Sequence, residues 1–70
     1  MEDKQNICDL LCKTLQATRN HEDLESLTYC KELGIEMVVA KWRNGGHREM
    51  NVFMDSGEAM IRDILYHIND

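Results

Sequence analysis

The chain has 70 residues, of which 43% are apolar and 30% charged, which suits one small folded domain (1–70) and excludes a disordered tail. Its net charge of −5 argues against direct nucleic-acid binding, because phosphate neutralisation requires surplus Lys and Arg. No apolar run approaches the roughly 18 residues of a membrane span, and the first residues lack a signal-peptide pattern. We therefore expect a cytoplasmic protein without a membrane partner.

Residues 3–18 carry the spacing of an amphipathic helix. Its apolar stripe follows the i, i+3, i+4, i+7 pattern and consists of Cys8, Leu11, Cys12 and Leu15. Three cysteines in a chain without an export signal favour reduced thiols. Cys8 and Cys12 lie on the stripe, where a free thiol packs as a small apolar residue.

Residues 24–31 fit two kinds of secondary structure. Leu27 and Tyr29 alternate with polar neighbours, which favours a strand, whereas the run up to Gly34 also fits a short helix. We adopt the strand, and join it to the next one by a three-residue loop at 32–34 that ends in a left-handed glycine. The resulting pairs are Tyr29 with Met37 and Leu27 with Val39.

Residues 35–54 give the clearest local signal, a β-hairpin that turns at Asn44-Gly45. Asn-Gly between alternating apolar runs is typical of a type I′ turn, which needs positive φ at both central residues. A two-residue loop then fixes the register by counting outward. It predicts one apolar face from three cross-strand pairs: Val39 with Met50, Met37 with Val52, and Ile35 with Met54.

A second helix follows the hairpin directly. Asp55 is the expected N-cap, with Glu58 at capping-box spacing. The apolar stripe of this helix consists of Met60, Ile61, Ile64, Leu65 and Ile68. The whole order predicts an α+β fold, a two-layer α-β-β-β-α arrangement in which two helices cover one face of a three-stranded antiparallel meander.

Two helices on one side leave the other face of the sheet bare. The register above puts four apolar side chains there: Val38, Ala40, Trp42 and Phe53. A domain of this size buries only about 60% of its unfolded surface, so a bare apolar face on it favours association. We expect a homo-oligomer whose interface uses these four residues.

A basic cluster with one aromatic residue lies at the tip of the hairpin, inside an otherwise acidic chain. Its members are Lys41, Trp42, Arg43, His47 and Arg48. Cationic groups bind phosphates or acidic surfaces and an indole stacks on rings, so the cluster is a candidate for binding a host protein or a small anionic ligand. The alternative is a solvated hairpin end, with Trp42 in the oligomer contact.

The remaining patterns predict no further site. Asp55-Ser56-Gly57 opens a helix N-terminus, but an acidic N-cap repels an incoming anion, and plain capping is preferred. The cysteines and histidines lack the paired spacings of zinc sites. The common catalytic motifs do not occur, so we expect neither an enzyme nor a bound cofactor or metal.

The stretch NGGHREMNVFMDSGEAMIRDILYHI, residues 44–68, resembles the ending of short uncharacterised proteins of Firmicutes and their phages. In that group a hairpin runs into a D-S-G-x-A-M-I-R-D-I helix, and the match is most specific over residues 55–63. Gly46-His47 departs from the aromatic residue expected after the turn glycine. The resemblance implies a phage or mobile-element origin and no particular chemistry.

Two functions follow as hypotheses. The first is a non-catalytic small binding protein that acts stoichiometrically as an oligomer and inhibits a host defence or nucleic-acid-binding protein. An acidic surface suits that role, because it competes for a site built to bind nucleic acid. The alternative is an oligomeric sponge that sequesters a nucleotide second messenger through the basic hairpin tip.

Overall fold

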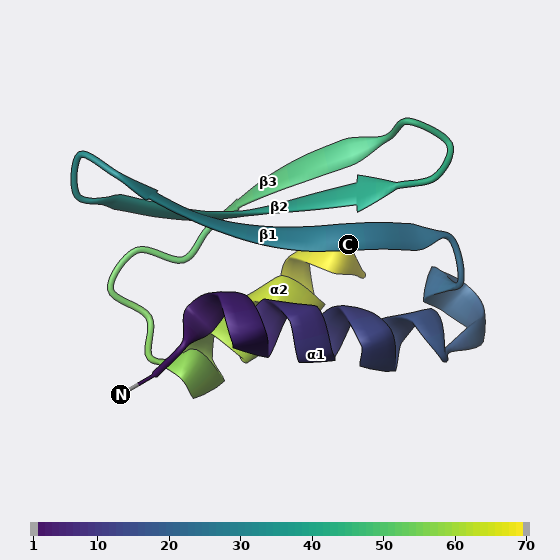
Figure 1. Ribbon diagram of the computed structural model, residues 1–70, viewed down its shortest axis with the longest axis horizontal. Helices are drawn as coiled ribbons and strands as arrows, with labels where there is room; N and C mark the ends of the chain where they lie inside the picture. The colour runs from purple at the N-terminus through teal and green to yellow at the C-terminus, as the bar shows by residue number, and fades with distance from the viewer. Residues whose placement is uncertain (1, 70) are drawn as a thin grey trace.

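The computed structural model describes residues 2–69. The chain runs through α1 (Lys4–Gln16), a short 3₁₀ turn η1 (Arg19–His21), β1 (Leu24–Glu32), β2 (Ile35–Trp42), β3 (His47–Asn51) and α2 (Gly57–Ile68). The strands form one antiparallel sheet in the order β1-β2-β3, and both helices lie against the same face (Figure 1). The expected α+β fold is confirmed, including the strand at 24–31.

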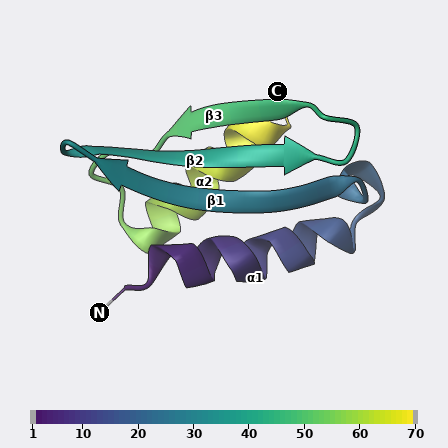
Figure 2. The same cartoon turned by 45° about the horizontal axis from the view of Figure 1, so that its top comes forward.

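The first helix packs as its sequence predicts, but it is shorter than the predicted 3–18 and spans Lys4–Gln16. Asp3 is the N-cap, and its side chain accepts a hydrogen bond from the Asn6 backbone N–H at 3.0 Å. The stripe residues Cys8, Cys12 and Leu15 are buried. The helix runs alongside β1, with α2 behind the sheet in the turned view (Figure 2).

The turn between β1 and β2 is shorter than predicted. Glu32 pairs directly with Ile35, which leaves a two-residue loop of Leu33 and Gly34 with φ values of 51° and 79°. Both central residues are left-handed, as in a type I′ turn, and a leucine takes one of the two positions. The predicted three-residue loop is therefore wrong, and Tyr29 pairs with Val38 rather than Met37.

The turn between β2 and β3 is longer than predicted. Gly45 N–H donates to the Trp42 carbonyl at 3.0 Å, and Trp42 N–H donates to the Gly46 carbonyl at 2.9 Å. Gly45 has a φ of 93°, so the loop at 43–45 is a turn followed by a left-handed glycine, the common three-residue connection. The register shifts by one, and Met50 pairs with Val38 instead of Val39.

Each one-residue shift moves β2 to its other face relative to its neighbours, because side chains alternate along a strand. The face under the helices, here called the covered face, therefore carries Glu36, Val38, Ala40 and Trp42 from β2. The opposite face, here called the open face, carries Ile35, Met37, Val39 and Lys41.

The predicted oligomer interface is therefore wrong in most of its residues. Val38 and Ala40 are 0% exposed in the core, and Trp42 is half-buried and packs against that core from the covered face. Their alternation along β2, together with Leu27 and Met50 from the neighbouring strands, explains the burial. Phe53 alone remains exposed, as expected.

The second helix begins one residue later than predicted. Ser56 is the N-cap, with its hydroxyl accepting from Ala59 N–H at 3.2 Å, so the Asp55 cap with Glu58 at its third position is wrong. Met60, Ile64 and Ile68 are buried, as expected of the stripe, whereas Ile61 is only partly so.

The two outer edges of the sheet differ. Polar side chains of α1 bond the free backbone groups of β1: Gln5 accepts from Tyr29 N–H at 2.8 Å and donates to the Leu27 carbonyl at 3.2 Å. Gln16 donates to the Leu24 carbonyl at 2.8 Å. The β3 edge has no such cover among residues 2–69, but it is five residues long and carries charge at Arg48 and Glu49.

Candidate functional site

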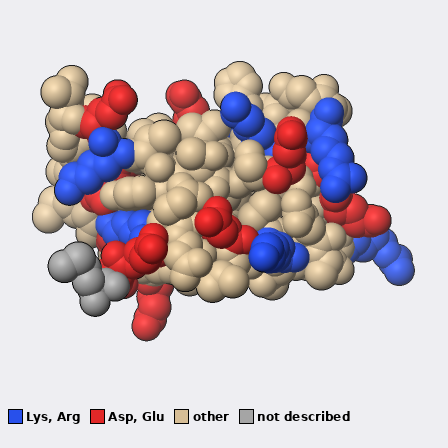
Figure 3. Space-filling view, in the orientation of Figure 1, with Lys and Arg blue, Asp and Glu red and all other residues tan. Residues whose placement is uncertain are grey.

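Charges of both signs are interspersed on the face shown in Figure 3, with Lys and Arg beside Asp and Glu along the molecule. A nucleic-acid footprint needs a continuous basic stripe, because each neutralised phosphate requires its own cation. This face does not provide one.

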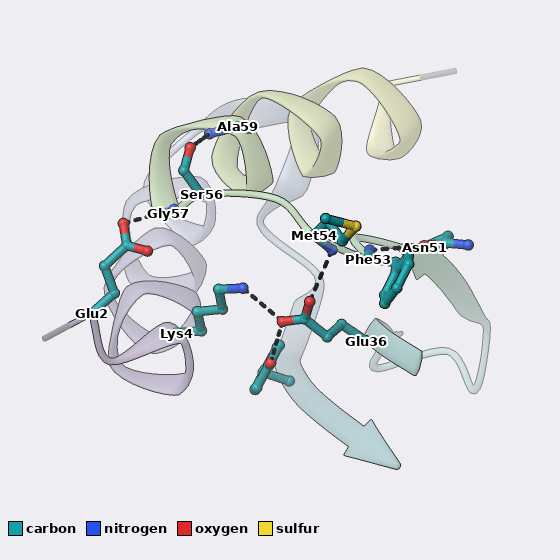
Figure 4. Close-up of polar contacts among 10 residues, drawn as sticks. Glu2, Lys4, Glu36, Asn51, Phe53, Met54, Ser56, Gly57 and Ala59 are labelled. Carbon is teal, nitrogen blue, oxygen red and sulfur yellow. Dashed lines mark hydrogen bonds and ion pairs between the residues drawn. The ribbon is translucent and has the colours of Figure 1, made fainter. Parts of the chain in front are cut away.

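A buried carboxylate, Glu36, joins α1, β1 and β2 to the segment between β3 and α2 (Figure 4). Its Oε1 accepts from Lys4 Nζ of α1 and from the Tyr29 hydroxyl of β1, both at 2.6 Å. Its Oε2 accepts from the Met54 backbone N–H at 2.9 Å. The hydrogen bonds from Lys4, Tyr29 and Met54 lower the pKa of Glu36 to about 2. Both oxygens are thus engaged within the chain, and the network is a structural clamp.

The clamp fixes the segment that leads into α2. Met54 has a φ of 63°, an uncommon conformation for a residue with a side chain, and its N–H is the group that Glu36 binds. Nearby, Glu2 Oε2 accepts from Gly57 N–H at 2.8 Å (Figure 4). A Cβ at Gly57 would lie 2.9 Å from Ile7 Cδ1, so glycine permits this close approach of the helices. The N-terminus of α2, which was considered from the sequence as an anion site, is thus hydrogen-bonded to the chain's own Glu2 carboxylate.

A pair of acidic residues lies beside the same segment. Asp55 Oδ2 is buried and has no donor among the described residues. Hydrogen bonding with Asp63, and then burial, raise the pKa of Asp55. Because its pKa is raised, Asp55 binds a proton at a higher pH than a free aspartate does, so it is a local source of pH dependence.

A polar recess of about 380 Å³ lies at the β2–β3 turn, at the end of the sheet predicted to hold the basic cluster. It is lined by Asn20, His21, Asp23, Trp42, Asn44, Gly46, His47, Arg48 and Ile68. The structure therefore brings three of the five predicted cluster residues together, and Lys41 and Arg43 are outside the lining.

The recess contains residues that sequence reasoning missed. Asn20 and His21 reach it from η1 and Asp23 from the residues just after it, and none of the three was among the predicted site residues. His21 Nε2 lies 2.8 Å from Asn69 Oδ1, and Arg48 donates to the His67 carbonyl near the end of α2. These long-range contacts gave no local signal in the sequence. The His67 carbonyl, near the negative end of the α2 dipole, partly offsets the positive charge of Arg48.

The open face carries a shallow apolar groove of about 340 Å³. Its lining consists of Cys30, Glu32, Leu33, Ile35, Met37, Val39 and Glu49. Leu33 is fully exposed in the left-handed β1–β2 turn, and Ile35 is 56% exposed. Gly or Asn adopts this left-handed conformation at a lower free-energy cost than leucine does. The fold alone therefore does not require an exposed leucine at this position.

The three thiols are free and differ in environment. Burial raises the pKa of Cys8 to about 11 and also raises that of Cys12. Cys30 is exposed and lines the open-face groove. Among residues 2–69 no three His, Cys, Asp or Glu side chains gather closely enough to hold a metal ion.

Comparisons with protein-family models, curated proteins and solved structures found no match. Over residues 2–69, neither helix has the length and apolar character needed to cross a membrane.

Proposed function

We propose that the chain is a non-catalytic binding protein that acts stoichiometrically, and that the open face is its association surface. The observation that supports this most is the apolar groove on that face, with Leu33 and Ile35 exposed at its end. Contiguous exposed apolar surface on a small domain usually marks an interaction site. The surface consists of Ile35, Met37 and Val39 in place of Val38, Ala40 and Trp42, which face the helices.

The energetics favour an associated state. Each Å² of apolar surface removed from water contributes about 25 cal/mol, and the groove side chains leave theirs exposed in the single chain. The left-handed Leu33 adds a conformational cost of roughly 1–2 kcal/mol to the single chain. A partner that buries Leu33 and Ile35 offsets both.

The biological setting follows from the resemblance of residues 44–68 to phage and Firmicutes proteins. An inhibitor of phage or mobile-element origin, working as an oligomer against a host defence or nucleic-acid-binding protein, fits the net charge of −5. Stoichiometric blocking also fits a chain whose charged Lys4–Glu36 clamp is engaged within the fold.

Matched substitutions on two surfaces test the proposed function. Ile35 and Leu10 are 56% and 57% exposed, the first on the open face and the second on α1. Immobilised Ile35→Lys protein should lose the partner that the native chain captures from host lysate, whereas Leu10→Lys should keep it. If both variants capture the same partner, the open face is not the association surface.

A second candidate function rests on the recess, because Trp42, His47 and Arg48 line it together with His21. An indole beside imidazole and guanidinium groups suits a nucleotide, through stacking and phosphate contacts. A ligand at 100 times its dissociation constant stabilises the folded chain by about 2.7 kcal/mol. A thermal-shift screen of cyclic and linear nucleotides should show this for the native chain and not for Trp42→Leu; if no nucleotide raises the melting temperature, the candidate is rejected.

A further inference from the structure

We infer that the open face packs on the open face of a second copy, with the two β2 strands antiparallel. This inference rests on the proposed function, since it takes the same surface and names its occupant. It differs from the interface expected from the sequence in its residues and in its geometry.

The sheet edges are unfavourable places for a second copy. On β1, Gln5 and Gln16 already occupy backbone groups that an added strand would need. Cys12 Sγ lies 3.8 Å from the Glu25 carbonyl on the same edge. The β3 edge is short and charged, two devices that limit edge-to-edge pairing. Association through a face is therefore favoured over association through an edge.

The charge pattern of the open face is complementary to itself in one orientation. Lys41 lies at one end of β2, and Glu32 lies on β1 beside Ile35, at the other end. When the second copy is turned so that its β2 runs in reverse, Lys41 of each copy approaches Glu32 of the other. Met37 and Val39 then meet in the centre, away from these charges.

The alternative orientation is less favourable. With the two β2 strands parallel, Lys41 would lie over Lys41 of the second copy, and like charges in contact are repulsive. In the reversed orientation Glu49 lies over Asn51 of the other copy, since these β3 residues pair with Val39 and Met37. The Asn51 amide can donate to that carboxylate through Nδ2, because within residues 2–69 its Oδ1 alone is engaged, as acceptor from Phe53 N–H.

The size of the face sets the expected affinity. Three strands about 4.8 Å apart and eight residues that each rise about 3.3 Å give a footprint of roughly 400 Å² per copy. Stable complexes bury roughly 800 Å² per partner. The dimer should therefore dissociate on dilution, with a dissociation constant in the micromolar to millimolar range.

Sedimentation velocity on the full chain tests the inference at concentrations from about 10 µM to 1 mM, which lie within the range of the expected dissociation constant. The average mass should rise from one chain toward two as the concentration rises. Lys41→Glu and Glu32→Lys should each raise the dissociation constant about tenfold, because a dimer contains this charge contact twice. The double variant should recover native affinity. The control, Lys13→Glu on the exposed side of α1, should dimerise as the native chain does.

Three outcomes would overturn the inference. The first is a native chain that stays monomeric at 1 mM. The second is a dimer that survives Ile35→Lys unchanged, and the third is a double charge-swap variant that fails to recover affinity. A monomeric chain that still captures a host partner, and loses it in Ile35→Lys, would overturn the dimer while leaving the proposed function in place.

Discussion

The two faces of β2 have nearly the same chemical character and opposite environments. Val38 and Ala40 are fully buried under the helices, whereas Val39 and Ile35 face outward on the other side. Both sets are apolar, so hydrophobicity does not decide which one becomes the core. The turns decide, because each sets a register and each register selects a face.

The largest expected contrast is between two isoleucines. Ile64 is 0% exposed beneath the covered face, and Ile35 is 56% exposed on the open face. Ile64→Ala should cost about 2–5 kcal/mol of unfolding free energy, because a cavity remains in the core. Ile35→Ala should cost under about 1 kcal/mol. Urea unfolding measures both, and equal losses would show that the faces are assigned incorrectly.

Neighbouring valines give a sharper comparison. Val38→Thr puts a hydroxyl into the core, where an unpaired polar group costs about 1–3 kcal/mol. Val39→Thr puts the same group on the open face, and the change should stay within about 0.5 kcal/mol. Thermal unfolding at low concentration, where dimers are absent, is the suitable measurement. A larger loss for Val39→Thr would restore the register first predicted from the sequence.

Within residues 2–69, Glu36 is the one charged residue whose side chain is buried. Its pKa is lowered from 4.5 to about 2, so its stabilising contribution is present above pH 4.5 and is lost as the pH falls toward 2. Glu36→Gln should therefore be less stable than the native chain at pH 7, and the two should converge in acid. Melting temperatures across this pH range test it. A constant difference at every pH would show that the Glu36 charge is not responsible.

The three cysteines should differ in their reactivity toward an alkylating reagent, with little change in the unfolding free energy. Cys30 lies on the open face, and Cys8 and Cys12 lie in the core. Iodoacetamide should modify Cys30 in the native chain and leave the other two thiols until the chain is unfolded, because burial removes access and disfavours the thiolate. Intact-mass analysis counts the adducts. Rapid modification of Cys8 would contradict the packing of α1.

The sequence predicted the helices and strands better than it predicted the register in which the strands pair. Helix stripes, the strand at 24–31 and the α+β order follow from periodicity that persists over many residues. The register depended on single loop residues: Leu33 adopts a left-handed conformation that its residue type does not predict, which shortens one turn, and Gly45 after Asn44 allows a longer second turn. Because β2 is apolar on both faces, nothing in its own pattern could correct either turn.

The sequence predicted the site residues that lie close together along the chain, and it missed the residues that the fold brings in from distant segments. Trp42, His47 and Arg48 lie close along the hairpin, and the sequence placed them in one cluster at its tip together with Lys41 and Arg43, but it predicted no recess. His21 joins them only through the fold, and Glu36 gains Lys4 as a partner 32 residues away. A lone glutamate in an apolar strand is a sequence signal for such a buried clamp.

The cover on the β1 edge has a consequence for synthesis. The residues that protect it, Gln5, Cys12 and Gln16, precede the strand in the chain and therefore leave the ribosome first. An N-terminal helix forms fast and its contacts with β1 are close in sequence, so the edge is occupied soon after it appears. Newly made chains crowded on one message would otherwise meet through that edge and aggregate. The order of α1 before β1 in the chain therefore protects the β1 edge from pairing with another chain during synthesis.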